Sequence, residues 1–194
     1  MSDSVNTNDQ QHILEVKGLQ TSFYTRAGTI RAVTGVDFHV NKGEVLGIVG
    51  ESGCGKAVTS LTILGLVGEP GKVEGGEVLF QGQDLLKLSS DEMRKIRGDR
   101  IAMIFQQPQS SLNPGMKFGQ QIAESLIIHR DMNNKEAHAR SLELMDMVGI
   151  PEANRRYEAY PHEMSGGMAQ RVMIAIALAC EPELLIADEP TTAL

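Results

Sequence analysis

The eight residues from Gly50 to Ala57 have the composition of a phosphate-binding loop. They read Gly-Glu-Ser-Gly-Cys-Gly-Lys-Ala, which follows G-x-x-x-x-G-K but has Ala57 where the pattern has Ser or Thr. The glycines let backbone N–H groups turn toward an anion, and the start of the next helix adds positive potential. Lys56 would face the β- and γ-phosphates, but the hydroxyl that ligates Mg²⁺ is absent. We therefore predict a nucleotide site whose Mg²⁺ coordination is altered. It is formed by Gly50, Glu51, Ser52, Gly53, Cys54, Gly55, Lys56, Ala57 and Val58.

A second group of chemically active residues follows the apolar run Leu184–Ala187. Asp188 and Glu189 end this run, so both carboxylates are expected at the C-terminal edge of a sheet, where open α/β folds bind ligands. One carboxylate could hold a metal ion and the other could orient or deprotonate water. The alternative is an acidic surface turn before Pro190. The phosphate loop upstream favours the catalytic interpretation.

A third motif, Ser165-Gly166-Gly167, begins the apolar helix expected over 168–179. Backbone N–H groups, a hydroxyl donor and the positive end of a helix dipole could together bind a second anion. Glycine would let a phosphate approach the backbone closely. The alternative interpretation is an ordinary helix N-cap, with Ser165 as the capping residue.

The elements that must position these motifs are strands and helices in alternation. Apolar patterns predict strands over 12–17, 32–40, 76–81, 101–105 and 184–187, and a buried parallel strand over 44–49 that leads into the phosphate loop. Helices are expected after the loop, over 90–97 and throughout 117–160. This order is typical of an α/β fold with a helical insertion.

Composition excludes several classes of protein. The chain has 194 residues and 41% hydrophobic content, which is enough for a sizeable core. Its net charge of −7 argues against a main role in binding nucleic acid. Two cysteines, Cys54 and Cys180, provide no disulfide framework and favour a reducing compartment. The longest apolar run is too short to span a bilayer, so we expect any membrane association to go through a partner.

The three motifs together resemble the ATP-binding subunit of an ABC transporter. The resemblance rests on the phosphate loop, on Ser165–Met168 followed by Gln170-Arg171, and on the segment 188–194, which reads Asp-Glu-Pro-Thr-Thr-Ala-Leu. Three further segments resemble the oligopeptide/dipeptide importer branch. They are 47–53, Ile104-Phe105-Gln106 with Ser111-Leu112-Asn113-Pro114, and Tyr160-Pro161-His162-Glu163.

The resemblance implies roles for individual residues. Gln106 would report on the metal ion and link the core to the helical lobe, and Asp188 would assist Mg²⁺. Glu189 would be the catalytic base for water. Ser165, Gly166 and Gly167 would face the ATP held by a second ATP-binding subunit, in a homo- or heterodimer. Phe23, or less favourably Tyr24, would stack on adenine, although a buried aromatic on a strand is often only part of a core.

The implied fold is a P-loop NTPase (RecA-like) core with an N-terminal antiparallel β subdomain and an inserted helical subdomain. We expect a disordered N-terminus over 1–11 and an incomplete nucleotide-binding domain over 12–194. Within it, 12–115 would hold the β subdomain and core, 116–160 the helical subdomain, and 161–194 the signature helix and Walker B strand. The family's next aspartate and its switch histidine would follow Leu194, so we expect a truncated product or a fragment that lacks the final strands.

The implied function is that of an ATPase subunit which couples ATP and Mg²⁺ to import of peptides or related solutes. It would act at the cytoplasmic face of the membrane with membrane subunits and a solute-binding protein. Ala57 is expected to lower hydrolysis much more than nucleotide binding, because phosphoryl transfer depends on metal positioning. One alternative is therefore a hydrolysis-impaired ATP-binding remnant. Another is a non-transport ABC protein that acts on nucleic acid or ribosomes, which the acidic charge disfavours.

Overall fold

The structure is a computed structural model that describes residues 12–190 of the chain. It divides into two compact units, Met1–Met93 and Arg94–Leu194, and each is presented by itself. The disordered N-terminus predicted over 1–11 lies outside the described residues, as do residues 191–194.

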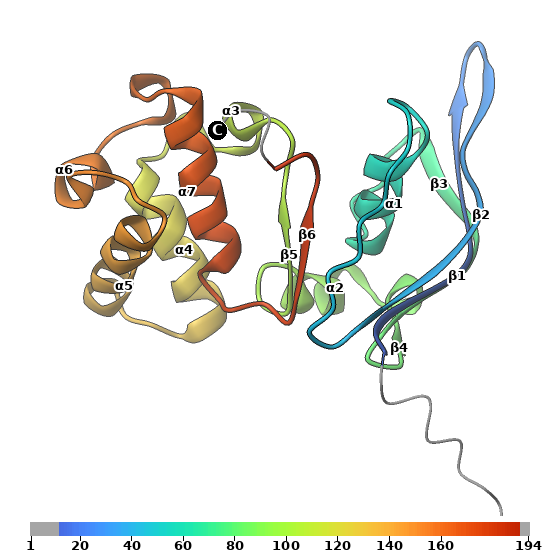
Figure 1. The fold of residues 1–194 in the computed structure, drawn as a ribbon, viewed down its shortest axis with the longest axis horizontal. Coiled ribbons are helices and arrows are strands. Elements are labelled where there is room, and N and C mark those ends of the chain that lie inside the picture. The colour runs from blue at the N-terminus through green and yellow to red at the C-terminus, as the bar shows by residue number, and fades with distance from the viewer. Residues whose placement is uncertain (1–11, 191–194) are drawn as a thin grey trace, which may run out of the picture. The chain divides into compact units, whose positions relative to one another are not determined.

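The first unit is built on an antiparallel sheet whose central strand is β1, His12–Thr25 (Figure 1). β1 pairs on one side with β2, Gly28–Asn41, and on the other with β3, Gly71–Phe80. The short strand β4, Gln83–Asp84, extends the sheet beyond β3, and a 3₁₀ helix, Leu85–Lys87, follows it. The three strands predicted for this region are confirmed, and each is longer than its apolar pattern indicated.

The core of this unit contains side chains that neighbour one another on the paired strands β1 and β3. Leu14 stands opposite Phe80, and Val16 stands opposite Val78. These four side chains and that of Leu19 are at most 2% exposed. Complete burial of such a side chain contributes about 1.5–3 kcal/mol to stability, so this set fixes the register of the sheet.

The helix predicted after the phosphate loop is confirmed as α1, Lys56–Ile63. The hydroxyl groups of Thr62 in α1 and Thr21 in β1 lie 3.1 Å apart at a buried position, which joins the helix to the sheet. At the start of the helix, Gly55 has a φ of 98° and lies against β2. A Cβ at this position would be 2.3 Å from the carbonyl oxygen of Ala32, so the chain can enter α1 here only with glycine.

The prediction of a buried strand over 44–49 is wrong. The segment contains no strand, and its apolar side chains are exposed, with Val45 and Val49 at 96% and 94%. A strand exists only through hydrogen bonds to a neighbouring strand, and no strand among the described residues pairs with this one. The apolar run predicted burial in a sheet. Burial of that kind requires a neighbouring strand, and the run itself does not provide one.

The second unit contains a parallel pair of strands, β5, Ile101–Ile104, and β6, Leu184–Ala187. Ile101 pairs with Leu184 and Ile104 with Ala187, so both strands end at the same edge. Both predicted strands are confirmed, and β6 has the predicted bounds. Helix α2, Ser90–Ile96, also confirms its prediction and contains the boundary between the two units.

The remainder of the second unit is helical, as predicted for 117–160 (Figure 1). Its helices are α3, Pro108–Ser111; α4, Phe118–Arg130; α5, Asn134–Met147; α6, Ala153–Tyr157; a 3₁₀ helix, Pro161–Glu163; and α7, Gly166–Leu178. Met173 and Ala177 of α7 pack against Ala102 and Ile104 of β5. Helix α7 therefore lies directly against β5, whose parallel partner β6 is followed by the predicted carboxylates.

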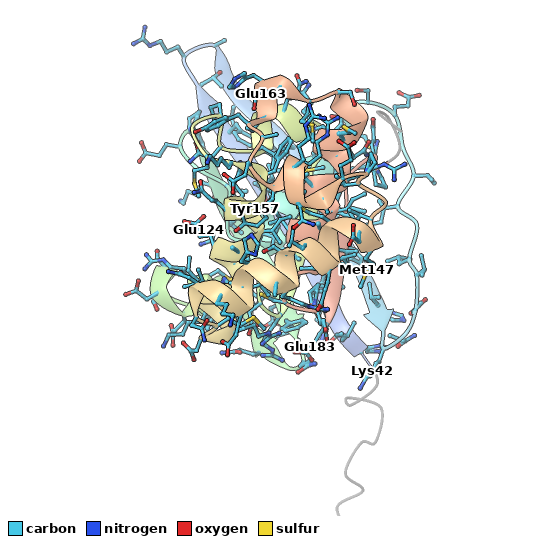
Figure 2. All side chains as sticks on the ribbon, turned by 90° about the vertical axis from the view of Figure 1, so that its left-hand side faces the viewer. Lys42, Glu124, Met147, Tyr157, Glu163 and Glu183 are labelled. Atoms are coloured by element: carbon cyan, nitrogen blue, oxygen red, sulfur yellow. The ribbon has the colours of Figure 1, made fainter. Side chains whose placement is uncertain are left out.

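A tight contact holds α6 against α4 and α5. The ring of Tyr157, labelled in Figure 2, belongs to α6. Its centroid lies 4.4 Å from that of the His138 ring on α5. The Tyr157 ring also lies over Gly119 on α4, where a Cβ would come within 1.9 Å of it. Glycine at this position thus permits the close approach of α6.

Among residues 12–190, none of the helices combines the length and apolar character that crossing a bilayer requires. The finer division at 115 and 160 predicted from the sequence stays a prediction.

Candidate active site

The phosphate loop in the first unit is held in shape by Lys56. Its ammonium donates to the carbonyl oxygens of Gly50 at 2.6 Å and Glu51 at 2.9 Å, and it lies 3.7 Å from the Sγ of Cys54. Gly53 and Gly55 have φ values of 82° and 98°, which other residues rarely adopt. The lysine side chain therefore crosses from the start of α1 to the first two residues of the loop. It lies close to where an anion on the backbone N–H groups would bind.

The start of α1 is suited to an anion because no side chain caps it. Its first-turn N–H groups and the positive end of the helix dipole face the loop. Ala57 is exposed in this first turn, and Val58 is half-buried. Thr59 does not replace the missing hydroxyl, because its buried Oγ1 donates to the carbonyl of Gly55 at 3.0 Å.

The aromatic candidates for adenine stacking lie at the end of β1. Phe23 is half-buried and packs over Gly71 of β3, where a Cβ would be 2.7 Å from the ring. The hydroxyl of Tyr24 donates to Glu74 at 2.8 Å, and this hydrogen bond raises the pKa of Tyr24. Stacking on adenine stays a prediction for Phe23.

In the second unit, the ends of β5 and β6 bring Gln106 and Glu189 together. Nε2 of Gln106 donates to Oε2 of Glu189 at 2.6 Å. The backbone N–H of Asp188 donates to the carbonyl of Ile104 at 2.9 Å, which extends the ladder one residue beyond β6. Asp188 is half-buried and Glu189 is exposed. The predicted placement of these carboxylates at the C-terminal edge of a parallel pair is the observed one.

Glu189 has a left-handed backbone with a φ of 46°. This conformation is uncommon for a residue other than glycine and is costly, and such strain often accompanies a functional site. Gln170 of α7 holds the adjoining residue by donating from Nε2 to the carbonyl of Pro190. Gln170 has no role in the chemistry predicted from the motifs. A polar residue within the apolar helix 168–179 was the available signal.

Ser165 is the N-cap of α7, since its Oγ accepts from the backbone N–H of Met168 at 3.4 Å. The ordinary capping role is thus present. A Cβ on Gly166 would meet nothing within 4 Å, so packing among the described residues does not require glycine there. Arg171 has a structural contact, because it donates to the carbonyls of Val148 and Gly149 just after α5.

Among residues 12–190, no three His, Cys, Asp or Glu side chains gather into a preformed metal site. Mg²⁺ commonly takes one or two protein oxygens and completes its shell with phosphate and water. Asp188 and the amide oxygen of Gln106 are donors of the required type at the strand ends. The residues present therefore fit Mg²⁺ that is brought with a nucleotide. Ala57 adds no hydroxyl ligand to this set.

Comparison with known proteins gives consistent results. The model of the ABC transporter family matches residues 33–192. The probable peptide ABC transporter ATP-binding protein y4tR of Sinorhizobium fredii is 57% identical over 94% of this chain and 55% of its own length. Oligopeptide transport ATP-binding protein OppD of Bacillus subtilis is 55% identical over 94% of this chain and 51% of its own. The chain thus spans about half the length of these curated relatives.

A solved structure gives the same family. It is the dimeric, post-hydrolysis structure of the ATP-binding cassette MJ0796 bound to ADP and Pi. It matches with a TM-score of 0.84 and 33% identity over 93% of this chain and 75% of that one. This likeness accords with the predicted P-loop NTPase fold and its antiparallel β subdomain. The chain belongs to the ABC transporter family.

Proposed function

We propose that the chain is the ATP-binding subunit of a transporter that imports peptides or related solutes. The observation that carries this proposal is the pairing of Gln106 with Glu189 at the ends of β5 and β6. A glutamine amide that holds a carboxylate beside a second acid, Asp188, is suited to orienting and deprotonating water. The relatives named as peptide and oligopeptide transport proteins support the class of solute.

The phosphate loop binds ATP in this proposal. The N–H groups at the start of α1 face the phosphates, and Lys56 moves from the carbonyls of Gly50 and Glu51 to the phosphate oxygens. Asp188 and Gln106 would hold Mg²⁺, which when bound would supply charge neutralisation at the transferred phosphoryl group. Glu189 accepts the proton of the attacking water.

A second ATP-binding subunit closes on the bound nucleotide through Ser165, Gly166 and Gly167, and the open space around Gly166 supports a close phosphate contact there. Membrane subunits dock on the helical lobe, and a solute-binding protein delivers the solute. The chain then lies at the cytoplasmic face of the membrane as a peripheral subunit.

A second candidate is a subunit that binds ATP without hydrolysing it. Ala57 favours this candidate because it removes one oxygen ligand from Mg²⁺ while leaving the anion-binding backbone intact.

The test measures ATP affinity and ATPase rate for the chain and for Lys56→Ala. We expect the wild type to bind ATP and turn it over, and Lys56→Ala to lose both. Lys42→Ala removes an exposed lysine in the turn after β2 and should change neither (Figure 2). Tight binding with no turnover would favour the second candidate. No ATP binding would reject both.

A further inference from the structure

Gln170 is a fully buried amide in a helix that is otherwise apolar where it faces the strands. Gln170 is 1% exposed, and Met173, almost one turn further along α7, is 4% exposed and packs against β5. Transfer of an amide from water into such surroundings costs free energy unless its polar atoms find partners. The position therefore calls for a specific reason to carry glutamine.

Only half of this amide is paired among the described residues. Nε2 donates to the carbonyl oxygen of Pro190, whereas Oε1 has no hydrogen-bond partner within residues 12–190. A half-satisfied buried amide is often less stabilising than an apolar residue of the same shape. Among residues 12–190, the bond to the carbonyl of Pro190 is therefore the contact that accounts for a glutamine at this position.

The bond to Pro190 fixes one end of the strained turn at Glu189. On the other side of Glu189, the backbone N–H of Asp188 is fixed by the carbonyl of Ile104. Proline has no N–H of its own, so its carbonyl is the only backbone hydrogen-bonding group that can anchor this end. The left-handed residue is therefore held from both sides, by the ladder of β5 and by α7.

We propose that Gln170 is a positioning residue for Glu189. By holding the carbonyl of Pro190, it maintains the left-handed turn that places the carboxylate of Glu189 2.6 Å from the amide of Gln106. Gln170 acts on the reaction through this turn and touches neither nucleotide nor water. The inference rests on the proposed function, because it assigns Glu189 the role of base.

The first experiment replaces Gln170 with methionine, which keeps the volume and removes both polar atoms. We expect the folded chain to keep its stability and ATP affinity, while kcat falls about 10- to 100-fold, since misplacing a reacting group by about 1 Å costs up to that factor. KM should change little. Unchanged kcat, or a fall in kcat that only matches a fall in the folded fraction, overturns the proposal.

Gln121→Met is the matched control. Gln121 is also a buried glutamine of the second unit, and it makes three hydrogen bonds to the backbone of Asn113 and Met116. This variant should lose stability and keep its kcat per folded molecule. The two variants thus separate loss of a structural amide from loss of a positioning one.

Hydrogen exchange gives a readout that does not need turnover. In Gln170→Met, the amides of 184–189 should exchange faster than in the wild type, while those in the first turns of α7 stay unchanged. If the wild type shows no ATPase activity, the proposed function fails and this measurement alone decides the positioning role. Unchanged exchange over 184–189 then overturns it.

Gln170→Glu supplies a pH-dependent rescue. A protonated carboxyl can donate to the Pro190 carbonyl, whereas a carboxylate cannot, and burial raises the pKa of a buried glutamate. The ratio of kcat in this variant to wild-type kcat should therefore rise several-fold as the pH falls from 8 to 6. A ratio that stays constant with pH contradicts the proposal.

Discussion

The amide of Gln106 and the carboxylate of Glu189 form a direct hydrogen bond of 2.6 Å across the ends of two parallel strands. The two residues are 83 positions apart in the sequence. Their meeting depends on the register of β5 and β6, in which Ile104 pairs with Ala187. Each strand thus delivers one of the two groups to the same edge, and the oxygen that would accept a proton is already oriented.

We expect Glu189→Gln to bind ATP normally and to hydrolyse it at least about 100-fold more slowly. The neutral amide keeps the shape of the side chain but cannot accept a proton, and general base catalysis contributes about 10²–10⁴-fold. Single-turnover ATPase measurements beside equilibrium ATP binding check this. Glu183→Gln, near the other end of β6, removes an exposed carboxylate that pairs with Arg100 and should retain the wild-type rate (Figure 2). A fast Glu189→Gln variant would exclude Glu189 as the base.

Ala57→Ser is expected to raise the Mg²⁺-dependent ATPase rate about tenfold or more, which corresponds to about 1.4 kcal/mol of transition-state stabilisation. The added hydroxyl lies in the first turn of α1 and supplies an oxygen ligand to the metal ion. ATP affinity without Mg²⁺ should not change. Ala57→Cys has a similar size but no oxygen, and Mg²⁺ prefers oxygen ligands, so it should give no gain. Equal rates for all three chains would show that position 57 does not limit hydrolysis.

The sequence predicted elements well where local pattern decides them. The bounds of β6, the helix after the phosphate loop and the placement of Asp188 and Glu189 at a strand end all follow from apolar runs and glycine positions. The same approach was wrong at 44–49, because an apolar run indicates a tendency to be buried but does not provide the strand that must pair with it.

Side-chain partnerships were the part that the sequence could not predict. Nothing in the residues near Gln170 indicates that its amide reaches the carbonyl of Pro190, twenty residues later. The hydrogen bond between Gln106 and Glu189 likewise depends on strand register. The motifs predict which residues would carry chemistry, and the tertiary structure decides which of them meet.

Gly119→Ala should destabilise the chain by about 1–3 kcal/mol, although alanine normally favours a helix over glycine. The new Cβ would lie 1.9 Å from the buried ring of Tyr157. Chemical denaturation followed by circular dichroism measures the loss. Gly115→Ala, where the nearest atom would be 3.5 Å away, should change stability by less than about 0.5 kcal/mol. In a double-mutant cycle with Tyr157→Leu, the two losses should be less than additive, because the smaller side chain relieves the clash.

The two cysteines should differ sharply in their reaction with an alkylating reagent. Cys54 is exposed within the phosphate loop and should react quickly, and bound ATP should slow its reaction because the nucleotide covers the loop. Cys180 is buried, its thiol lies 3.6 Å from the carbonyl oxygen of Ser125, and burial raises the pKa of that thiol.

Cys180 should consequently react only when the chain unfolds. The thiol of Cys180 ionises more readily in the unfolded chain than in the folded one. Burial of the neutral thiol therefore contributes fully to the free energy of unfolding below the ordinary cysteine pKa, and this contribution is lost as the pH rises through the higher folded pKa. Mass spectrometry of chains labelled at neutral pH, with and without denaturant, measures both reactions. Cys54→Ser removes the fast reaction and serves as the control. Rapid labelling of Cys180 in the folded Cys54→Ser chain would show that the packing around α7 and α4 opens far more often than its burial implies.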